Sequence, residues 1–299
     1  MSGRVVLSGA SGLIGRALIE SFNADGIDTI TLVRRPAKNE REIEWHPGSA
    51  PLDPAVLAGA RAVVNLNGAS IGKLPWTRTY RAQLLESRVV PTRTLAKAIR
   101  ELGAAAPLFV SASAVGFYGD RPGEQLTETS SVGETFLADI CADWEREAFA
   151  AGPDARVTLL RTASVLHPRA VLKPLIPLTR AGLAGPLGGG RQFWPWVSLE
   201  DEVRAIRHLI DHNIQGPVNI CGPQAASANE IGRELARQLR RPFWLPAPKF
   251  ALRLALGRDA ADSLLLADAH VTPDVLTRSG FEFTHPTVTS AITAGMRAK

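Results

Sequence analysis

The first half of the chain alternates short apolar runs with longer stretches in which apolar residues recur every three to four positions. Short runs rich in Val, Ile and Leu predict strands, and the longer periodicity predicts helices. The predicted strands cover residues 5–7, 29–33, 62–66, 108–111 and 156–160. The predicted helices cover about 13–24, 77–102 and 134–150. Apolar strands separated by helices indicate a parallel sheet that is covered on both faces.

The pattern changes after about residue 165, where Pro and Gly become frequent. This half predicts helices at about 200–212 and 228–240, a strand at 218–220, a Pro-punctuated helical segment at 252–269 and a short piece at 280–283. We therefore expect an α/β protein with a doubly wound parallel sheet in residues 1–165. A smaller C-terminal α/β lobe is expected in residues 166–299, and the helix at 200–213 is expected to return to the first domain.

Composition narrows the class of protein. The 299 residues are 45% hydrophobic, which excludes a disordered chain, and 34 basic against 29 acidic residues give a net charge of +5. Such a surplus, expected to be spread over the whole chain, favours anionic partners. A run of arginines at 237, 240 and 241 carries no nucleic-acid recognition motif, so we expect no nucleic-acid partner.

Cysteine and membrane signals point to an intracellular protein. The two cysteines, Cys141 and Cys221, are too few for a disulfide scaffold, and the six scattered histidines predict no metal site. An uncharged stretch at 102–119 approaches membrane-spanning length, but Pro107 and the glycines within it favour a buried strand. The chain runs directly into the first predicted strand, so we expect no signal peptide. We expect a cytoplasmic monomer or homodimer that contacts no membrane.

A glycine-rich loop follows the first predicted strand and opens the first predicted helix. It reads Gly9-Ala10-Ser11-Gly12-Leu13-Ile14-Gly15, a G-x-x-G-x-x-G spacing. In such a loop one glycine makes a tight turn, one lets backbone N–H groups approach a pyrophosphate, and the third lets the helix pack on the strand. The helix N-terminus also favours negative charge. The loop predicts a Rossmann-type dinucleotide site, with an ordinary Gly-rich turn as the alternative.

The end of the second predicted strand indicates which dinucleotide binds. Sites for NAD usually carry Asp or Glu there, where it accepts a hydrogen bond from the ribose 2′-OH. This chain has Arg34 and Arg35 at that place, and guanidinium groups suit a 2′-phosphate. We therefore expect NADP(H) as the cofactor, unless both arginines are solvated surface residues.

A family resemblance is carried by eight stretches spread over essentially the full chain: 9–15, 64–68, 76–88, 111–119, 160–166, 185–192, 196–197 and 245–281. In these stretches the sequence resembles the extended, epimerase-like branch of the short-chain dehydrogenase/reductase superfamily. Within that branch it is similar to an atypical group called epimerase family proteins, whose bacterial members are described as sugar-nucleotide epimerases.

The resemblance implies an NADP-binding Rossmann domain, a lobe on the substrate side and a family-type C-terminal segment at about 248–297. It also implies roles for single residues. Leu66, Asn67 and Gly68 would line the adenosine-ribose side of the cofactor, although Asn67 replaces the Ala that is usual there. Arg88 would be a further contact to an anionic group. Val165 would lie along the nicotinamide side, with core packing as the alternative.

The chemistry of this superfamily normally uses a Ser with a Tyr-x-x-x-Lys pair on one helix, which places Tyr and Lys on the same helix face. This chain lacks the pair, because its two tyrosines, Tyr80 and Tyr118, are followed four residues later by Leu and Pro. In the helix where the resemblance places the pair, Phe136 and Ile140 occupy the two positions. Phe has no proton to give, and Ile carries no charge.

Two residues are the main candidates for catalysis. Ser113 stands at the position of the family serine, or it simply ends a strand. Tyr118 lies after the same strand and would act as an alternative acid or, as we favour, close the pocket. Asp139 is a further candidate acid, although an exposed helix aspartate is commoner.

The sequence thus predicts an NADP(H)-dependent oxidoreductase or epimerase with a small-molecule hydroxyl or carbonyl substrate, a sugar nucleotide among the options. The alternative is an NADP(H)-binding sensor or scaffold without turnover, which the missing Tyr–Lys pair favours.

Overall fold

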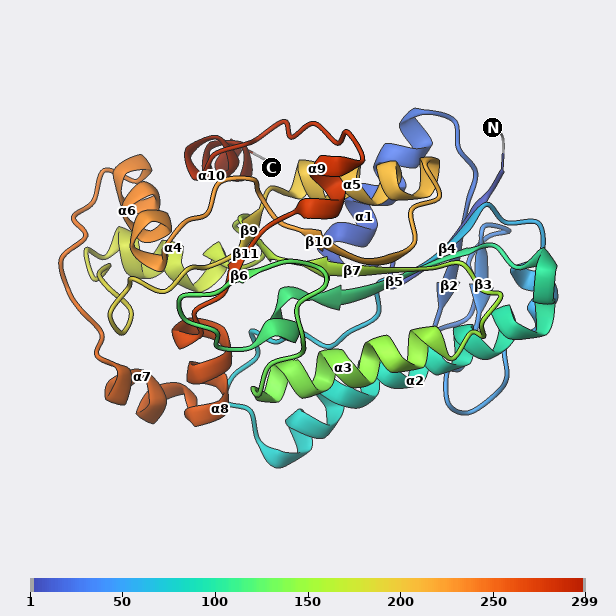
Figure 1. Ribbon diagram of the computed structural model, residues 1–299, viewed down its shortest axis with the longest axis horizontal. Coiled ribbons are helices and arrows are strands. Elements are labelled where there is room, and N and C mark those ends of the chain that lie inside the picture. Colours follow the sequence, from blue (N-terminus) through green and yellow to red (C-terminus); the bar gives the residue numbers. More distant parts are fainter. Residues whose placement is uncertain (1–2, 298–299) are drawn as a thin grey trace.

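The computed structural model of the chain describes residues 3–297. Its centre is a seven-stranded sheet with the order β10-β7-β5-β4-β1-β2-β3, in which every neighbouring pair is parallel (Figure 1). The strands are β1 (Val5–Ser8), β2 (Thr29–Val33), β3 (Glu42–Glu44), β4 (Ala62–Asn65), β5 (Leu108–Ala114), β7 (Val157–Thr162) and β10 (Gly216–Ile220). All strands predicted from the apolar runs lie in this sheet, whereas the three-residue β3 was not predicted.

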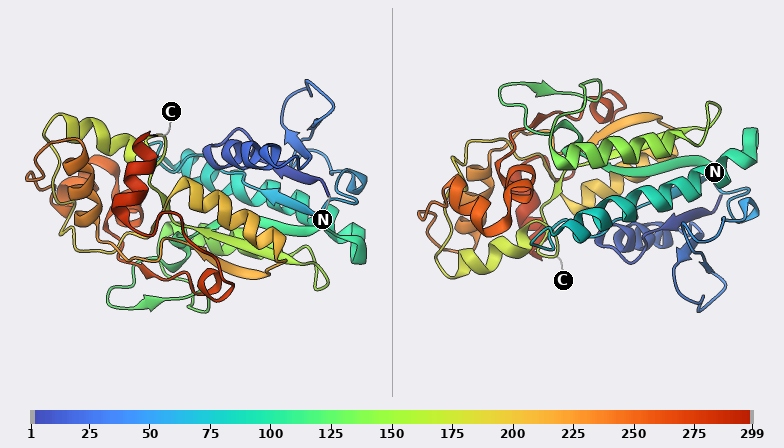
Figure 2. Two further views of the ribbon diagram at one scale, coloured as in Figure 1. Left: turned by 90° about the horizontal axis from the view of Figure 1, so that it is seen from above. Right: turned by 90° about the horizontal axis from the view of Figure 1, so that it is seen from below.

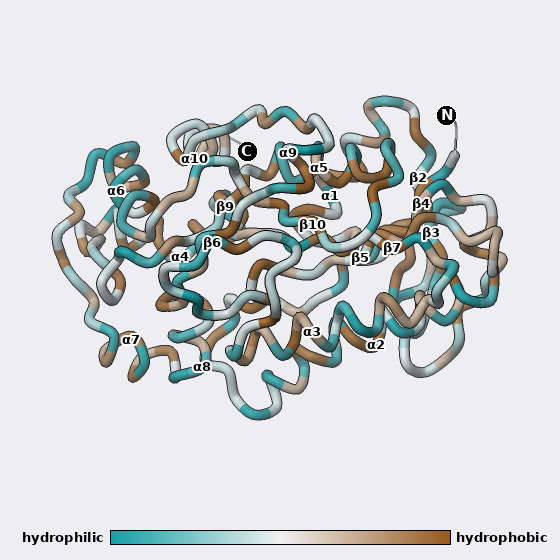
Figure 3. The backbone as a smooth tube through the Cα atoms, in the orientation of Figure 1, coloured by the Kyte–Doolittle hydropathy of each residue, from teal (hydrophilic) through white to brown (hydrophobic). Residues whose placement is uncertain are grey.

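Helices cover both faces of the sheet. The helices α1 (Leu13–Ala24) and α5 (Leu199–Asp211) lie on one face, and α2 (Arg78–Leu102) and α3 (Phe136–Phe149) lie on the other (Figure 2). Alternate residues of β1 serve the two layers, because Val5 and Leu7 join the core under α1 and Val6 joins the core under α2. Figure 3 shows hydrophobic residues along the central strands. The predicted α/β fold with a doubly wound parallel sheet is confirmed.

The C-terminal part of the chain adds a second, smaller core at one end of the molecule. The helices α4 (Leu172–Arg180), α6 (Ala228–Gln238) and α10 (Val288–Arg297) pack around buried Trp194 and Trp196. Short pieces complete this part: β6 (Gln125–Leu126) with β11 (His270–Val271), β8 (Ser164–Val165) with β9 (Trp196–Val197), α7 (Lys249–Leu256), α8 (Arg258–Ala261), a π-turn (Asp262–Leu266) and α9 (Asp274–Arg278). Single 3₁₀ turns lie at Pro54–Val56, Gly103–Ala105 and Val115–Tyr118.

The structure differs from the sequence prediction mainly in this C-terminal part. The helical segment expected at 252–269 is divided at Gly257, whose φ of 84° ends α7. The helices α4 and α10 were not predicted, and Pro177 inside α4 hid its periodicity. The helix α5 packs against α1, and β10 joins the main sheet, so the chain returns to the sheet after residue 198. The domain division at residue 165 stays a prediction.

Candidate cofactor-binding site

The candidate site lies where the strand order of the sheet reverses. The chain moves outward from β1 through β2 and β3 in one direction, and through β4, β5, β7 and β10 in the other. In open α/β sheets ligands bind in the crevice at the carboxyl ends of the strands on either side of such a reversal. Here the two strands are β1 and β4, and they end at Ser8 and Asn65.

The glycine loop sits in this crevice and needs its glycines. Gly9 has a φ of 81°, and a Cβ there would lie 2.5 Å from the carbonyl carbon and oxygen of Leu66. A Cβ on Gly15 would lie 2.6 Å from the oxygen of Gly9. The first contact holds the loop against the end of β4, and the second packs α1 onto the turn. Ser11 and Gly12 form the exposed tip of the loop.

The N-terminus of α1 differs from those of the other long helices. Thr77, Thr135, Ser198 and Ser227 each accept a hydrogen bond from the first turn of α2, α3, α5 and α6. The N-cap of α1 is Gly12, which offers no side chain for this role. The N–H groups of that first turn are therefore left to water or a ligand, and they favour an anion such as a pyrophosphate.

A hydrogen-bond network joins the two strand ends beside the loop. The Asn67 side-chain nitrogen donates to Ser8 Oγ at 2.7 Å and to Asn65 Oδ1 at 2.8 Å. Asn65 in turn donates to Thr92 Oγ1 of α2 at 2.7 Å. Asn67 thus holds β1 and β4 together at the crevice, a contact that the Ala usual at this position cannot make.

Arg88 lies directly behind this part of the crevice. Its guanidinium donates to the carbonyl oxygens of Leu84 at 2.8 Å and Ala69 at 3.1 Å, and a Cβ on Gly68 would lie 3.2 Å from its Cζ. Burial lowers the pKa of Arg88, and within residues 3–297 it forms no ion pair with a carboxylate. A desolvated cation of this kind fits an anionic ligand.

Arg34 and Arg35 follow β2 at the same edge of the sheet. Of the two, only Arg35 has a partner among the residues that the structure describes. Arg35 forms a bidentate ion pair with Glu42 of β3, with N–O distances of 2.7 and 2.6 Å. The guanidinium of Arg35 is the main reason that the pKa of Glu42 falls to about 2. Arg34 is exposed and makes no hydrogen bond or ion pair with any residue that the structure describes. It can therefore meet a ligand phosphate without breaking an existing contact.

The two candidate catalytic residues belong to one buried polar network. Ser113 Oγ donates to Glu145 Oε1 at 2.7 Å, and Glu145 forms a bidentate ion pair with Arg161 at 2.9 Å on both branches. Arg161 also donates to the Tyr118 hydroxyl at 2.9 Å. The structure therefore brings Ser113 and Tyr118 together through two residues, Glu145 and Arg161, to which the sequence analysis assigned no role.

Tyr118 is enclosed in this network. Its side chain has no exposed surface, and its hydroxyl donates to Asn219 Oδ1 at 2.6 Å. Burial raises the pKa of Tyr118 to about 12, although Arg161 acts in the opposite direction. In this arrangement the hydroxyl reaches no surface from which a substrate could approach. Val165 is likewise in the core, where β8 pairs with β9. Catalytic and cofactor roles for these two residues stay predictions.

The family resemblance places the Tyr and Lys positions at Phe136 and Ile140 of α3. A different face of this helix meets the turn that follows β5. A Cβ on Gly116 would lie 3.4 Å from Leu137 Cβ and 3.9 Å from Cys141 Sγ, and Glu145 follows four residues later. Phe136 and Ile140 pack in a cluster with Tyr80 and Leu84 of α2, which Leu137 also joins. Leu137 and Cys141 are thus the α3 residues beside the turn that follows β5, and neither restores the Tyr–Lys pair.

A buried acid lies at the same edge, at the end of β7. Glu202 of α5 has no exposed surface, and its Oε1 accepts a hydrogen bond from Thr162 Oγ1 at 2.8 Å. Its Oε2 has no hydrogen-bond partner in the described part of the chain. Burial raises the pKa of Glu202 to about 8, which favours the neutral form of the carboxyl at pH 7. Sequence reasoning missed this residue, because an acid in the first turn of a helix is ordinary.

Arg161 was missed although the sequence holds a signal for it. It is the charged residue in the otherwise apolar or neutral strand Val157–Thr162, and it is 4% exposed. A buried arginine needs a carboxylate and further acceptors, which Glu145 and Tyr118 supply. The partner was not identifiable from spacing, because Glu145 and Arg161 are 16 positions apart and lie on a helix and on a strand.

Comparisons with known proteins identify the family. A family model described as the NAD dependent epimerase/dehydratase family matches residues 5–221, and a model of a domain of unknown function, DUF1731, matches residues 247–294. An epimerase family protein of Mycobacterium bovis, Mb2239, is 40% identical over 96% of both chains.

Two solved structures extend the comparison. The human epimerase family protein SDR39U1, crystallised with NADPH, is 26% identical with a TM-score of 0.87 over 99% of this chain and 100% of the human one. A protein of Corynebacterium glutamicum described as a nucleoside-diphosphate sugar epimerase is 30% identical, with a TM-score of 0.79 over 99% of this chain and 58% of its own. The resemblance noted in the sequence is confirmed, and the chain belongs to the NAD-dependent epimerase/dehydratase family.

Proposed function

We propose that the chain binds NADP(H) in the crevice between the ends of β1 and β4. The observation that carries this proposal is the bare N-terminus of α1 behind a loop in which Gly9 leaves no room for a side chain. The first-turn N–H groups of α1 would bind the pyrophosphate, and the free guanidinium of Arg34 would bind the 2′-phosphate. The relative crystallised with NADPH supports the choice of cofactor.

Other residues of the crevice would hold the rest of the cofactor. The Leu66–Gly68 backbone would line the adenosine ribose, because Gly9 approaches this stretch directly after the end of β4. Arg88 would support that backbone from behind and add positive charge toward the phosphates. Arg35 has a smaller role in this proposal, since its guanidinium is occupied by Glu42.

We further propose that the bound cofactor exchanges hydride with a hydroxyl or carbonyl carbon of a small-molecule substrate, in the sugar-nucleotide class. The nicotinamide ring supplies hydride chemistry of this kind when it is bound. The relative described as a nucleoside-diphosphate sugar epimerase supports the substrate class. Ser113 is proposed to accept a hydrogen bond from a substrate hydroxyl, because its own O–H donates to Glu145 and its lone pairs remain; for a carbonyl substrate this O–H would have to turn from Glu145 to the substrate oxygen.

A second function has its own support. A protein that binds NADP(H) without turnover, as a sensor or scaffold, needs no proton donor at the substrate carbon. Both hydroxyls that could serve this role, on Ser113 and Tyr118, are buried and already hydrogen-bonded. Leu137 and Cys141 do not replace the missing Tyr–Lys pair.

A substrate screen separates the two functions. NADPH oxidation and NADP⁺ reduction would be followed by absorbance with a panel of sugar nucleotides and simple carbonyl compounds. With an active substrate, Ser113→Ala should lower kcat by at least about tenfold, the usual contribution of a positioned proton-handling group being larger still. Tyr118→Phe serves as the matched variant, because its effect should appear in stability rather than in kcat. Tight NADPH binding with no turnover on any substrate would favour the sensor.

The remaining expectations stay predictions. These are a cytoplasmic location, a monomer or homodimer, and the absence of a nucleic-acid partner. Within residues 3–297, no helix is both long and apolar enough to cross a membrane.

A further inference from the structure

The positive charge of the chain is concentrated in one segment. The 24 residues from 235 to 258, which we call the basic segment, contain six basic residues and no acidic residue. The other 275 residues contain 28 basic and 29 acidic residues, so they are close to neutral. The net charge of +5 is therefore not spread over the chain, as the sequence analysis expected.

The same segment exposes large apolar side chains. Phe250 and Leu254 of α7 are 74% and 87% exposed, and their spacing of four places them on one face of the helix. Trp244 is 63% exposed, and its backbone and ring nitrogens donate to the carbonyls of Ala184 and Gly182, beside exposed Leu183. The segment runs along one end of the molecule, at the left of Figure 1, and α7 has no buried residue.

Three of the six basic residues in the basic segment form ion pairs, and the other three form none within residues 3–297. Arg253 and Arg258 share Asp262, at 2.8 and 3.6 Å, and Arg237 pairs with Glu234. Arg240, Arg241 and Lys249 form no ion pair with any residue in 3–297, and all three are exposed. Lys249 directly precedes Phe250, so a free cation and an inserted aromatic ring would meet the same surface.

We propose that the basic segment docks on the surface of an anionic phospholipid bilayer. An apolar helix face with Trp, Phe and Leu inserts at the boundary between headgroups and acyl chains, and flanking Lys and Arg are attracted to anionic lipid. A second copy of this chain is a poor occupant, because a two-fold contact would bring like charges together. Nucleic acid would engage the arginines but would leave Leu254 exposed. This proposal departs from the expectation of no membrane contact, which rested on the lack of a spanning segment, because the contact proposed here lies on the membrane surface.

Vesicle binding tests the proposal. The full chain would be floated with vesicles of phosphatidylcholine alone and of phosphatidylcholine mixed with phosphatidylserine. We expect binding to the mixed vesicles and weak binding to the neutral ones. Binding to the mixed vesicles should decrease as the ionic strength rises above about 0.15 M, because salt screens the charges. Equal binding to both vesicle types, or to neither, would overturn the proposal.

Paired variants assign the contact to the segment. Arg240→Glu with Arg241→Glu should weaken binding to the mixed vesicles by at least about 30-fold, the factor for two lost contacts of about 1 kcal/mol each. Phe250→Ser with Leu254→Ser should also weaken it by more than about tenfold through lost apolar burial. Matched controls are Lys97→Glu on α2 and Phe149→Ser on α3, which are exposed on other elements and should bind as the wild type does.

Three results would each contradict the proposal. The first is a loss with the control variants as large as that with the segment variants. The second is a dimer in sedimentation that Phe250→Ser with Leu254→Ser converts to a monomer, which would make the patch an interface between copies. The third is tight RNA binding that depends on Arg240 and Arg241 but is unchanged by that apolar pair of substitutions, without vesicle binding.

Discussion

At the scale of single residues, burial decides what a polar side chain can do in this protein. Tyr118 was singled out because tyrosine is scarce, but its hydroxyl is held between Arg161 and Asn219 in the core. Arg34 and Arg35 are equally good candidates for the phosphate contact in the sequence. In the structure only Arg35 forms an ion pair with Glu42, which leaves Arg34 available to a ligand. The sequence could not show this, because Glu42 lies in a strand of three residues that has too little pattern to predict.

Glu202 gives the residue-scale prediction. Its pKa is about 8 in the folded chain against 4.5 as the ordinary value, so its contribution to stability is present below pH 4.5 and is lost as the pH rises through about 8. Glu202→Gln removes this titration. Across this window, the free energy of unfolding of the variant should therefore increase relative to that of the wild type by about 1.4 kcal/mol for each pH unit. Urea unfolding at several pH values measures the difference, and a difference that is constant with pH would contradict the assignment.

At the scale of elements, the alternation of apolar runs and helical periodicity was enough to predict the sheet and its covering helices. It failed for α4 and α10, which are only nine and ten residues long, and α4 also contains a proline. The glycine loop was predicted fully, because its spacing and its place between a strand and a helix follow from the geometry of one turn. The contact of Gly9 with the end of β4 is a tertiary feature, and only the structure shows it.

Gly9, in the loop before α1, and Gly26, just after α1, provide a matched pair of Gly→Ala substitutions. Gly9→Ala should lower the free energy of unfolding by about 3 kcal/mol or more and abolish NADPH binding, because a Cβ would meet the backbone of Leu66 at 2.5 Å. Gly26 has a φ of 68° but no atom within 4 Å of its Cβ position, so Gly26→Ala should cost only about 1 kcal/mol and retain binding. Urea unfolding and NADPH titration check both. Similar losses in the two variants would show that conformation at Gly9, and not close approach, matters.

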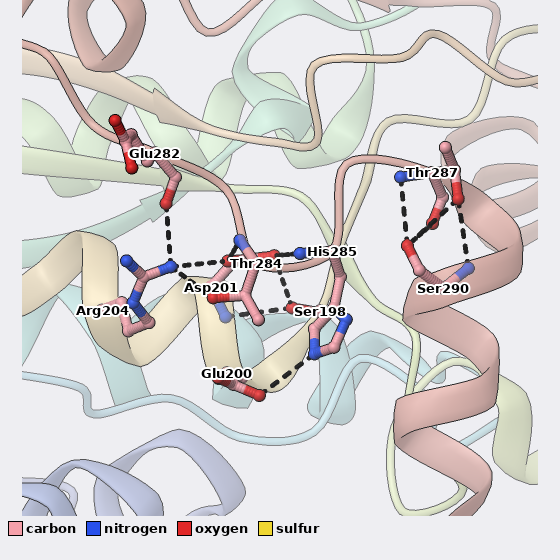
Figure 4. A network of polar contacts seen from close by, with 9 residues as sticks. All are labelled: Ser198, Glu200, Asp201, Arg204, Glu282, Thr284, His285, Thr287 and Ser290. Carbon is pink, nitrogen blue, oxygen red and sulfur yellow. Dashed lines mark hydrogen bonds and ion pairs between the residues drawn. The ribbon is translucent and has the colours of Figure 1, made fainter.

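At the scale of the whole molecule, one buried carboxylate ties the C-terminal segment to the sheet domain. Asp201 of α5 is 1% exposed and accepts hydrogen bonds from the backbone N–H groups of Thr284 at 2.7 Å and His285 at 2.9 Å (Figure 4). Arg204 donates to the Glu282 carbonyl beside them at 2.8 Å. The piece at 280–283 is therefore a loop that leads to α10, and its role depends on a partner far away in the sequence.

Removing the Asp201 carboxylate should weaken the attachment of the C-terminal segment, including α10, to the sheet domain. Asp201→Ala leaves two part-buried N–H groups without their charged acceptor and should lower the free energy of unfolding by about 3 kcal/mol. Amide hydrogen exchange in α10 should also become faster. Glu200→Ala is the control, since it removes only the more exposed contact to the His285 ring and should change stability by less than about 0.5 kcal/mol. Unchanged exchange in α10 of Asp201→Ala would show that the tail is held by other contacts.

The most direct test of the central claim is a calorimetric titration of the wild type and Arg34→Ala with NADPH and NADH. The account predicts that the wild type binds NADPH at least about tenfold more tightly than NADH, since a charged hydrogen bond to phosphate contributes about 1.5–3 kcal/mol. Arg34→Ala should lose most of that preference with NADH affinity unchanged, and Arg35→Ala should lose less of it. Equal affinity of the wild type for the two cofactors, or no binding of either, would contradict the account.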